Sequence, residues 1–433
     1  MKTNENDTKQ GIVPTLRFLE FDSRVWHIKE LSQIANLIKE RAKNGSYTPM
    51  SVTSGVGLIP QKEKFGRDIS GNQYGSYFVI KKGDFAYNKS ATNLYPEGYI
   101  SMLKNHEIAA VPNSIFICFK VNRKEILPEY LNYLFEDNYH GKWLRKFIEV
   151  GARAHGSLSI DTKKLFELPI VFPSISEQQK IADCLSSIDA LIKATENKID
   201  ELKAHKKGLM QQLFPAEGKT IPQYRFPEFR NTAIWKEAPL SGIGETLQGY
   251  GFPEAYQGKE TGKYPFYKVS DISKAIQLGN NYISVAANYV DDEDVNTLRI
   301  KTIPIGTTIF ARIGEAIRLN RRVITTAECI IDNNTIGVKA IEGKATDLFV
   351  YYTLLQVTLI DFAGGVVPAV TKASIDNIPV YCPPTIAEQQ KIADCLSSVD
   401  DLIMAQTNCL EALKAHKKGL MQQLFPNIND YEK

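Results

Sequence analysis

Two stretches of the sequence, separated by about half the chain, are nearly the same. Residues 177–215 read EQQKIADCLSSIDALIKATENKIDELKAHKKGLMQQLFP, and residues 388–426 read EQQKIADCLSSVDDLIMAQTNCLEALKAHKKGLMQQLFP. About 30 of the 39 positions are identical, at a constant offset of about 211 residues. A match of this length at one spacing indicates an internal duplication, and it organises the rest of the chain.

Each copy of the repeat predicts one long helix. Apolar residues recur at alternating steps of four and three, which places them in a single stripe on a helix. Ser174 and Thr385 stand three residues before Glu177 and Glu388. In that arrangement the hydroxyl can accept a free amide of the first turn while the glutamate reaches back to the cap. The proline that closes each copy cannot continue a helix.

The two helices are expected to pair with each other. A narrow apolar stripe must be buried, and the only other stripe of the same length and pattern in the chain is its duplicate. We therefore predict an antiparallel coiled coil with pseudo-twofold symmetry. Polar residues at Thr195, Lys206, Gln406 and Lys417 either fix its register or are a simple lapse in the pattern. The predicted seam contains sixteen residues: Ile181, Leu185, Ile188, Ile192, Ile199, Leu202, Leu209, Leu213, Ile392, Leu396, Val399, Ile403, Leu410, Leu413, Leu420 and Leu424.

A weaker repeat precedes the helix in each half. RFLEF at residues 17–21, followed by Trp26, matches RFPEF at residues 225–229, followed by Trp235. The sequences between this motif and the helix differ, although both contain strand-like runs, one helix and then a small-residue loop. The runs are 76–81, 115–121, 307–311 and 335–340, the helices 129–150 and 346–362, and the loops 151–157 and 364–370.

These patterns predict an α+β fold with two mixed α/β domains, each followed by a long helix. Nearly identical helices beside dissimilar domains suggest that the helices perform one task twice and the domains two different tasks. The predicted division is 1–173 for the first domain with its N-terminal tail, 174–215 for the first helical spacer, 216–384 for the second domain, 385–426 for the second spacer and 427–433 for a tail.

Composition excludes several classes of protein. The 433 residues are 43% hydrophobic and 23% charged, as in ordinary globular proteins, and no stretch approaches the length of a membrane span. The polar N-terminus lacks a secretion signal, so we expect a cytoplasmic protein. The six cysteines are widely spaced without a C-x-x-C pair, which argues against disulfides and a zinc site. The net charge of +3 is uneven, with about +6 in residues 1–173 and about −1 in residues 216–384.

The combination of motifs resembles the DNA specificity subunit of Type I restriction–modification systems, over about residues 14–426. The RF-x-EF segment with its tryptophan, the variable domain, the EQQKIA helix start and the KKGLMQQLFP helix end all occur twice. The resemblance implies two target-recognition domains that read a bipartite site in double-stranded DNA, and helical spacers that hold two methyltransferase subunits. Restriction subunits complete such a complex, and S-adenosylmethionine, ATP and Mg²⁺ are expected in these partners, with no cofactor in this chain.

The sequence itself contains no recognisable catalytic motif. There is no phosphate-binding loop, because the string at residues 258–263 has the wrong spacing. The acidic run 291–294 with residues 342–344 could suggest a Mg²⁺-dependent nuclease, but a solvated loop is the simpler interpretation. His205 and His416 occupy one repeat position on the polar side of the helix, far from a second metal ligand. We therefore expect no catalytic residue and no metal site.

Candidate DNA-binding residues are basic or amide residues near strand ends and loops, because such side chains hold phosphates and read bases. They are Lys81, Lys82, Asn88, Lys89, Arg153 and His155 in the first domain and Arg312, Arg318, Asn320, Arg321 and Arg322 in the second. Two alternatives remain open at this point. One is the specificity subunit of a related system that cuts beside its site, and the other is a coiled-coil scaffold without a DNA role.

Overall fold

The computed structural model describes residues 13–90, 92–148 and 161–426, and these form two compact units. Unit 1 contains the described residues up to Lys193 together with those from Ala412 onward. Unit 2 runs from Ala194 to Glu411. Each unit therefore contains part of both long helices. The boundaries between these units differ from the predicted domain boundaries at residues 173/174 and 384/385, and the predicted domain division stays a prediction.

Unit 1 is built on two four-stranded sheets and one strand pair. The first sheet has the order β2 (Ala35–Leu37), β9 (Phe116–Val121), β6 (Phe85–Asn88), β7 (Tyr99–Met102). The second sheet has the order β4 (Gly57–Pro60), β3 (Thr48–Thr53), β8 (Ile108–Val111), β5 (Phe78–Lys81), and β1 (His27–Glu30) pairs with β10 (Pro169–Phe172). The short helices are α1 (Leu31–Ile34), α2 (Gln61–Phe65), α3 (Pro128–Glu136), α4 (Tyr139–Leu144) and α5 (Thr162–Phe166).

Unit 2 repeats this plan with different residues. Its larger sheet has the order β12 (Gly244–Gln248), β19 (Thr335–Ala340), β16 (Thr308–Ala311), β17 (Arg322–Thr325), β14 (Tyr282–Ile283). Its second sheet has the order β15 (Tyr289–Val290), β13 (Tyr264–Tyr267), β18 (Ile330–Ile331), and β11 (Lys236–Pro239) pairs with β20 (Pro379–Cys382). The short helices are α7 (Val269–Gln277), α8 (Asp292–Leu298), α9 (Asp347–Leu355) and α10 (Lys372–Asp376).

The first sheet of unit 1 and the larger sheet of unit 2 correspond strand by strand. In unit 1 the order β2-β9-β6-β7 matches β12-β19-β16-β17 in unit 2, and all of these neighbours are antiparallel. Asn88 at the end of β6 pairs with Phe116, just as Ala311 at the end of β16 pairs with Thr335. The expected mixed domain in each half is confirmed.

The predicted domain helices are shorter than expected. The run 129–150 was predicted as one helix, but α3 ends at Glu136 and α4 begins at Tyr139, because Asn138 takes a left-handed backbone conformation with φ of 56°. The run 346–362 likewise divides into α9 and a 3-10 turn, Leu359–Phe362. Periodicity alone does not show such breaks, since the apolar residues continue through them.

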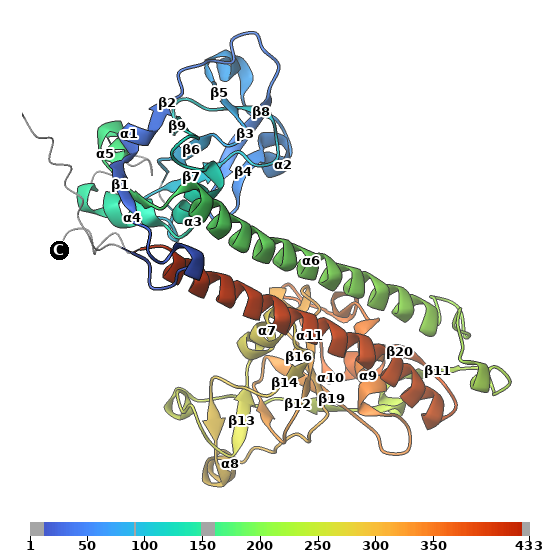
Figure 1. Ribbon diagram of the computed structural model, residues 1–433. Coiled ribbons are helices and arrows are strands. Elements are labelled where there is room, and N and C mark those ends of the chain that lie inside the picture. Colours follow the sequence, from blue (N-terminus) through green and yellow to red (C-terminus); the bar gives the residue numbers. More distant parts are fainter. Residues whose placement is uncertain (1–12, 91, 149–160, 427–433) are drawn as a thin grey trace, which may run out of the picture. The chain divides into compact units, whose positions relative to one another are not determined.

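The two long helices are α6 (Ile175–Leu213) and α11 (Ile386–Leu424), drawn in green and red in Figure 1. They pack together and run antiparallel. In unit 1 the start of α6, at Ile181 and Leu185, shares a core with Leu424 near the end of α11. In unit 2 the end of α6, at Leu213, shares a core with the start of α11 at Ile392.

The predicted seam residues lie on the inner side of both helices. Eleven of the sixteen are buried, and Ile192, Leu202, Leu209, Leu413 and Leu420 are half-buried. By contrast, Leu191 and Leu402, which are equivalent in the repeat, are 55% and 52% exposed. The stripe is therefore narrow, as expected for a two-helix contact.

Each repeat ends in the sequence Leu-Phe-Pro, which we call its LFP end. The phenylalanine of the first repeat packs in the core of the second domain, and that of the second repeat packs in the core of the first domain. Phe214, at the end of α6, stacks on Phe349 of α9 with ring centroids 5.7 Å apart and meets Trp235 edge-on at 6.1 Å. Phe425, at the end of α11, packs on Tyr130 of α3 at 5.3 Å. The domain of each half is thus closed by an aromatic residue from the other half of the sequence.

Among the described residues, no helix is both long enough and apolar enough to cross a membrane. All six cysteines are free, in agreement with their spacing, but only Cys118 and Cys329 are buried. Burial raises the pKa of both these thiols.

Candidate DNA interface

One pair of loops occupies the same place in both units. Residues 89–98 join β6 to β7, and residues 312–321 join β16 to β17; we call them the two hairpin loops. The first residue of each is a half-buried cation, Lys89 or Arg312. The Lys89 amide donates to the Ile115 carbonyl at 3.3 Å and the Arg312 amide to the Asn334 carbonyl at 2.9 Å. Neither side chain has an ion pair or hydrogen bond with another described residue.

In unit 2 the small-residue loop predicted at 364–370 packs on the hairpin loop. The Gly314 amide donates to the Pro368 carbonyl at 2.8 Å, and the Val370 amide donates to the Arg312 carbonyl at 2.9 Å. Val366 at the tip of this loop is fully exposed. The backbone of 312–314 is therefore fixed from both sides while the Arg312 side chain remains available.

The predicted arginine cluster divides into two groups. Arg312, Arg318 and Arg321 lie in the hairpin loop, where Arg318 pairs with Glu315 at 3.1 Å and both of these side chains are exposed. An exposed pair of this kind contributes little and can exchange for a phosphate. Arg321 is half-buried and makes no side-chain bond to another described residue.

Arg322 and Asn320 have a structural role that the sequence did not reveal. Arg322 is 1% exposed, and its guanidinium donates to the carbonyls of Asn320 and Val357 at 3.1 and 2.6 Å. Burial lowers its pKa to about 10. The Asn320 amide also donates to the Val357 carbonyl, at 3.0 Å. Both residues hold the base of the hairpin loop against the chain after α9, so we no longer count them as candidate DNA contacts.

The candidates in unit 1 lie at opposite ends of β6. Lys81 and Lys82 precede it, and Lys82 pairs with Glu107 at 2.9 Å on the surface. Asn88 is buried, and its side-chain oxygen accepts the Ser90 amide at 2.9 Å, which shapes the start of the hairpin loop. Lys89 is therefore the candidate on the loop itself. Arg153 and His155 lie outside the described residues.

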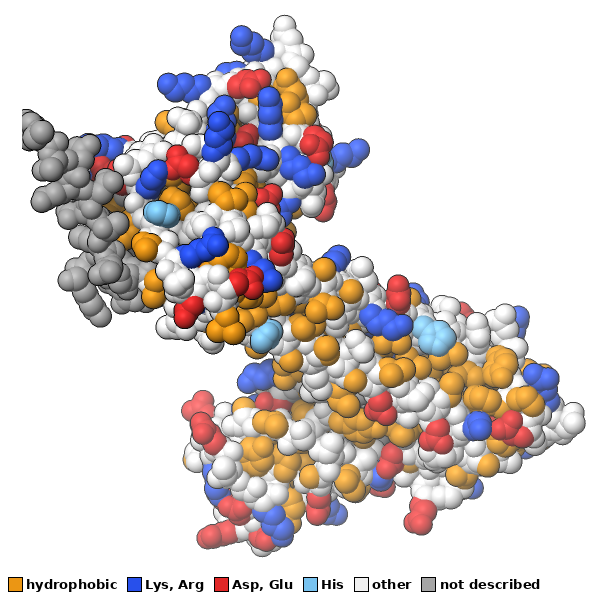
Figure 2. Space-filling model, viewed as in Figure 1, with side chains coloured by type: hydrophobic (Ala, Val, Ile, Leu, Met, Phe, Trp, Pro, Cys, Tyr) orange, Lys and Arg blue, Asp and Glu red, His pale blue; other side chains and the backbone are white. Residues whose placement is uncertain are grey.

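The second sheet of unit 1 carries a basic surface that was not predicted from the sequence. Figure 2 shows Lys and Arg side chains gathered over the part of unit 1 that carries β3, β5 and β8. The signal in the sequence was the spacing of cations at every second or third residue near β2 and on α2. The exposed residues are Lys39, Arg41, Lys43, Lys62, Lys64 and Arg67.

The corresponding region of unit 2 is acidic and internally paired. Beside β13 and β15, Lys263 pairs with Asp292 at 2.7 Å, and Lys259 pairs with Asp291 and Asp294. The acidic run considered for a nuclease site is therefore neutralised by lysines and begins α8. In the described part of the chain, no three His, Cys, Asp or Glu side chains gather as a metal site requires. His205 and His416 are both exposed.

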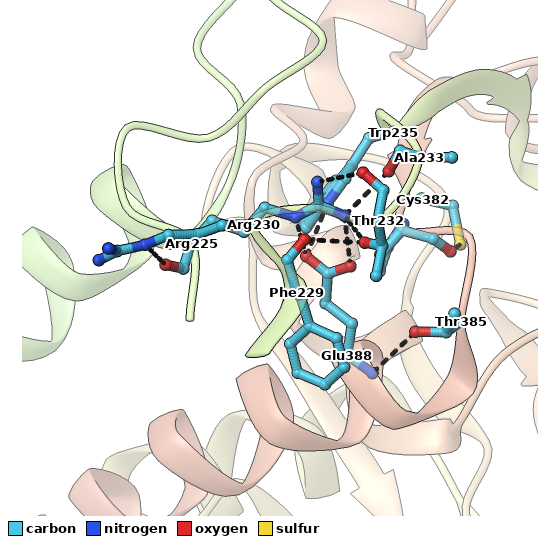
Figure 3. Close-up of polar contacts among 10 residues, drawn as sticks. Arg225, Phe229, Arg230, Thr232, Ala233, Trp235, Cys382, Thr385 and Glu388 are labelled. Carbon is cyan, nitrogen blue, oxygen red and sulfur yellow. Dashed lines mark hydrogen bonds and ion pairs between the residues drawn. The ribbon is translucent and has the colours of Figure 1, made fainter. Parts of the chain in front are cut away.

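The RF-x-EF motif forms an arginine–glutamate anchor at the start of each long helix. Figure 3 shows Arg225 facing Glu388, with bonds of 2.6 and 2.7 Å between the guanidinium and the two carboxylate oxygens. The Trp235 indole donates to the same carboxylate at 3.1 Å. Arg17 binds Glu177 with the same two-pronged geometry, at 2.7 and 2.8 Å. Because both glutamates are buried, each carboxylate requires its cation.

This geometry corrects part of the predicted helix cap. The Thr385 hydroxyl accepts the Glu388 amide at 3.3 Å, as expected, but Ser174 bonds to Ser176 instead. The two glutamates do not reach back to the cap, since arginines from the RF-x-EF motif bind them. The next residue in each copy, Gln178 or Gln389, docks the helix on the domain by accepting the amide of Leu127 or Thr346.

Comparison with known proteins agrees with the duplicated plan. The family described as the Type I restriction modification DNA specificity domain matches this chain twice, at residues 24–204 and 233–415. The chain belongs to this family. Each match begins just before the tryptophan of the RF-x-EF motif and ends within a long helix. Specificity subunits are the non-catalytic, DNA-recognising subunits of Type I restriction–modification systems, so the expected family, fold class and role are confirmed.

Several relatives come from Methanocaldococcus jannaschii. A protein assigned as the MjaX type I restriction enzyme specificity subunit is 26% identical, with 92% of each chain covered. The MjaVIII specificity subunit is 37% identical, with 68% of this chain and 69% of the relative covered. Among solved structures, the S subunit of a Type I system from M. genitalium gives a TM-score of 0.61 at 14% identity, with 96% of this chain and all of the other covered. This last likeness supports the fold.

Proposed function

We propose that the chain reads a bipartite site in double-stranded DNA, one half-site per unit, through the two hairpin loops. The observation that carries this proposal is the matched position of Lys89 and Arg312. Two domains with different sequences both begin the same loop with a cation that no other described residue binds. Base and phosphate contacts require such unpaired basic groups on a fixed backbone. The proposed contact residues are Lys89, Arg312, Arg318 and Arg321, with Lys81 and Lys82 as weaker candidates.

The proposal extends to the partners of the complex. The two halves expose matched apolar residues: Val25 with Ile234, and Leu191 with Leu402. Two similar surfaces support binding of two copies of one protein, which for this family would be two methyltransferase subunits. Restriction subunits would join them, and S-adenosylmethionine, ATP and Mg²⁺ would be bound by these partners. Such a complex would act in the cytoplasm, on the cell's own and incoming DNA.

Salt-dependent binding tests the DNA-reading loop. The assembled complex should bind its duplex with an affinity that falls linearly with salt on a double logarithmic plot, because phosphate contacts release counterions. Arg312→Ala should weaken binding by about 1–3 kcal/mol and relax base preference in one half-site. Lys236→Ala is the matched control, since it removes an exposed cation from β11 and should leave affinity unchanged. Equal effects of the two variants would contradict the proposed loop.

A further inference from the structure

A lysine near the end of each repeat is half-buried against residues from the other half of the sequence. In unit 2, the Lys206 ammonium of α6 lies 2.5 Å from an Asp400 oxygen of α11, and these side chains are 14% and 10% exposed. The hydroxyl of Tyr352 on α9 donates to the other Asp400 oxygen at 2.7 Å. The ammonium also lies 5.3 Å from the centre of the Tyr352 ring. We call this group the unit 2 junction.

Unit 1 contains the same group built from the opposite copies. The Lys417 ammonium of α11 lies 2.7 Å from Asp189 of α6, and the Tyr133 hydroxyl of α3 donates to Asp189 at 2.8 Å. Lys417 is 5.1 Å from the centre of the Tyr133 ring, and it also pairs with Glu136 at 3.1 Å. Burial alone would lower the pKa of Lys417, but the carboxylates of Glu136 and Asp189 raise it above the ordinary value.

These junctions explain the polar interruptions of the predicted seam at Lys206 and Lys417. The two carboxylates are partly exposed, Asp400 at 10% and Asp189 at 37%, and sliding the helices by one turn would separate both from their lysines at once. The neighbouring lysines, Lys207 and Lys418, are exposed and take no part. Each junction joins three helices: the two long ones and one from a recognition domain. Each domain is therefore in contact with both long helices, one from each half of the sequence.

In unit 2 the junction is connected to the hairpin loop by short polar contacts. Tyr352 lies on α9, which packs on the strands that carry the loop, β16 and β17. Just beyond α9, the Val357 carbonyl accepts bonds from Asn320 and Arg322 at the base of the loop. The Leu359 amide donates to the Asn320 side chain at 3.1 Å. A displacement of α9 would therefore move the hairpin loop.

Unit 1 shows a corresponding connection with different residues. The helix after α3 is α4, where buried His140 lies 3.4 Å from the Gly98 carbonyl at the end of the hairpin loop. The Arg145 guanidinium, just beyond α4, donates to the Glu97 carboxylate at 2.6 Å. The Tyr87 hydroxyl of β6 donates to the Glu97 carbonyl at 2.7 Å. In unit 1 the hairpin loop is thus bonded to α4 and the residue after it, while α3, which carries the junction tyrosine Tyr133, packs on β7 at the end of the loop.

We propose that the residues of the two Lys–Asp–Tyr junctions are positioning residues that hold each hairpin loop at a fixed place on the helix pair. They would thereby restrict the complex to one gap, meaning one number of base pairs between the two half-sites. The inference rests on the proposed function, that the hairpin loops read DNA. The junction residues do not contact bases. Their loss should therefore leave the half-site sequences unchanged and widen the range of accepted gaps.

The test is to sequence the methylation of a genome modified by the full complex carrying Lys206→Met or Lys417→Met. Methionine keeps the apolar stem but removes the charge. Methylation at gaps one base pair longer or shorter, relative to the native gap, should rise about tenfold, which corresponds to ~1.4 kcal/mol. Tyr352→Phe, which removes only the hydroxyl, should give a smaller rise in the same direction. Lys206→Arg should restore the single gap, because it keeps charge and reach.

The controls separate positioning from plain stability. Lys207→Met and Lys418→Met change the adjacent exposed lysines and should retain one gap. If Lys206→Met and Tyr352→Phe lower the melting temperature while the gap stays single, the junctions are structural only and the inference is wrong. If the wild-type complex methylates no bipartite motif, the proposed function fails instead. A widened gap with unchanged half-sites supports both.

Discussion

At the residue scale, the motif residues that recur in both halves bind the start of each long helix to the RF-x-EF segment. Glu177 and Glu388 are inside the protein, and each meets an arginine from the RF-x-EF segment about 160 residues earlier. The repeat alone predicted a helix cap for these glutamates, because their local spacing fits one. Sequence spacing could not show the arginine partner, since that contact forms only when the chain returns on itself.

Removing one member of this pair should destabilise unit 2. Glu388→Gln leaves Arg225 without its carboxylate and weakens the bond to Trp235, so we expect a loss of about 3–5 kcal/mol in the free energy of unfolding. Glu228→Gln is the matched control, because Glu228 pairs with Lys391 at 3.6 Å on the surface. Its effect should stay below about 0.5 kcal/mol. Urea unfolding of both variants measures the difference, and equal losses would contradict a buried anchor.

The different positions of the arginines in the predicted cluster could not be predicted from the sequence. Arg312, Arg321 and Arg322 are near neighbours of one chemical type, and composition cannot separate them. The strand register places Arg322 inside β17, opposite Phe310, whereas the other two lie in the loop. Register depends on pairing between distant strands, so it becomes visible only in the folded unit.

At the element scale, the long helices and the main strands were predictable because their patterns are local. The predicted runs 115–121 and 335–340 differ from β9 and β19 by no more than one residue. The break at Asn138 and the role of the LFP ends were not predictable. Phe214 and Phe425 follow their helices in sequence, yet they pack in domains from the other half.

The closing role of the LFP ends gives a prediction that distinguishes the two units. Phe214→Ala removes the ring that packs on Phe349 and Trp235 and should destabilise unit 2 by about 3–5 kcal/mol. Phe425→Ala should do the same to unit 1. Hydrogen exchange of the full chain measures this, through faster exchange in β16 and β19 for the first variant and in β6 and β9 for the second. If Phe214→Ala accelerated exchange mainly in unit 1, the assignment would be wrong.

At the scale of the whole molecule, the duplication gives two similar sets of helices and helix contacts, whereas the domains have diverged in sequence. Both long helices take part in each unit, and the anchors, junctions and LFP ends are built twice from equivalent residues. The hairpin loops differ in sequence, with one lysine in residues 89–98 and three arginines, at 312, 318 and 321, in residues 312–321. This division supports the proposal that each unit reads its own half-site.

The most direct test of this account exchanges residues 24–170 for the same region of another family member and sequences the methylation that the full complex produces. The anchors, α6 and α11 stay those of this chain, apart from contacts that the new domain must make itself. The account predicts that one half-site changes to that of the donor, while the other half-site and the gap stay the same. A change in both half-sites, or in neither, would contradict it.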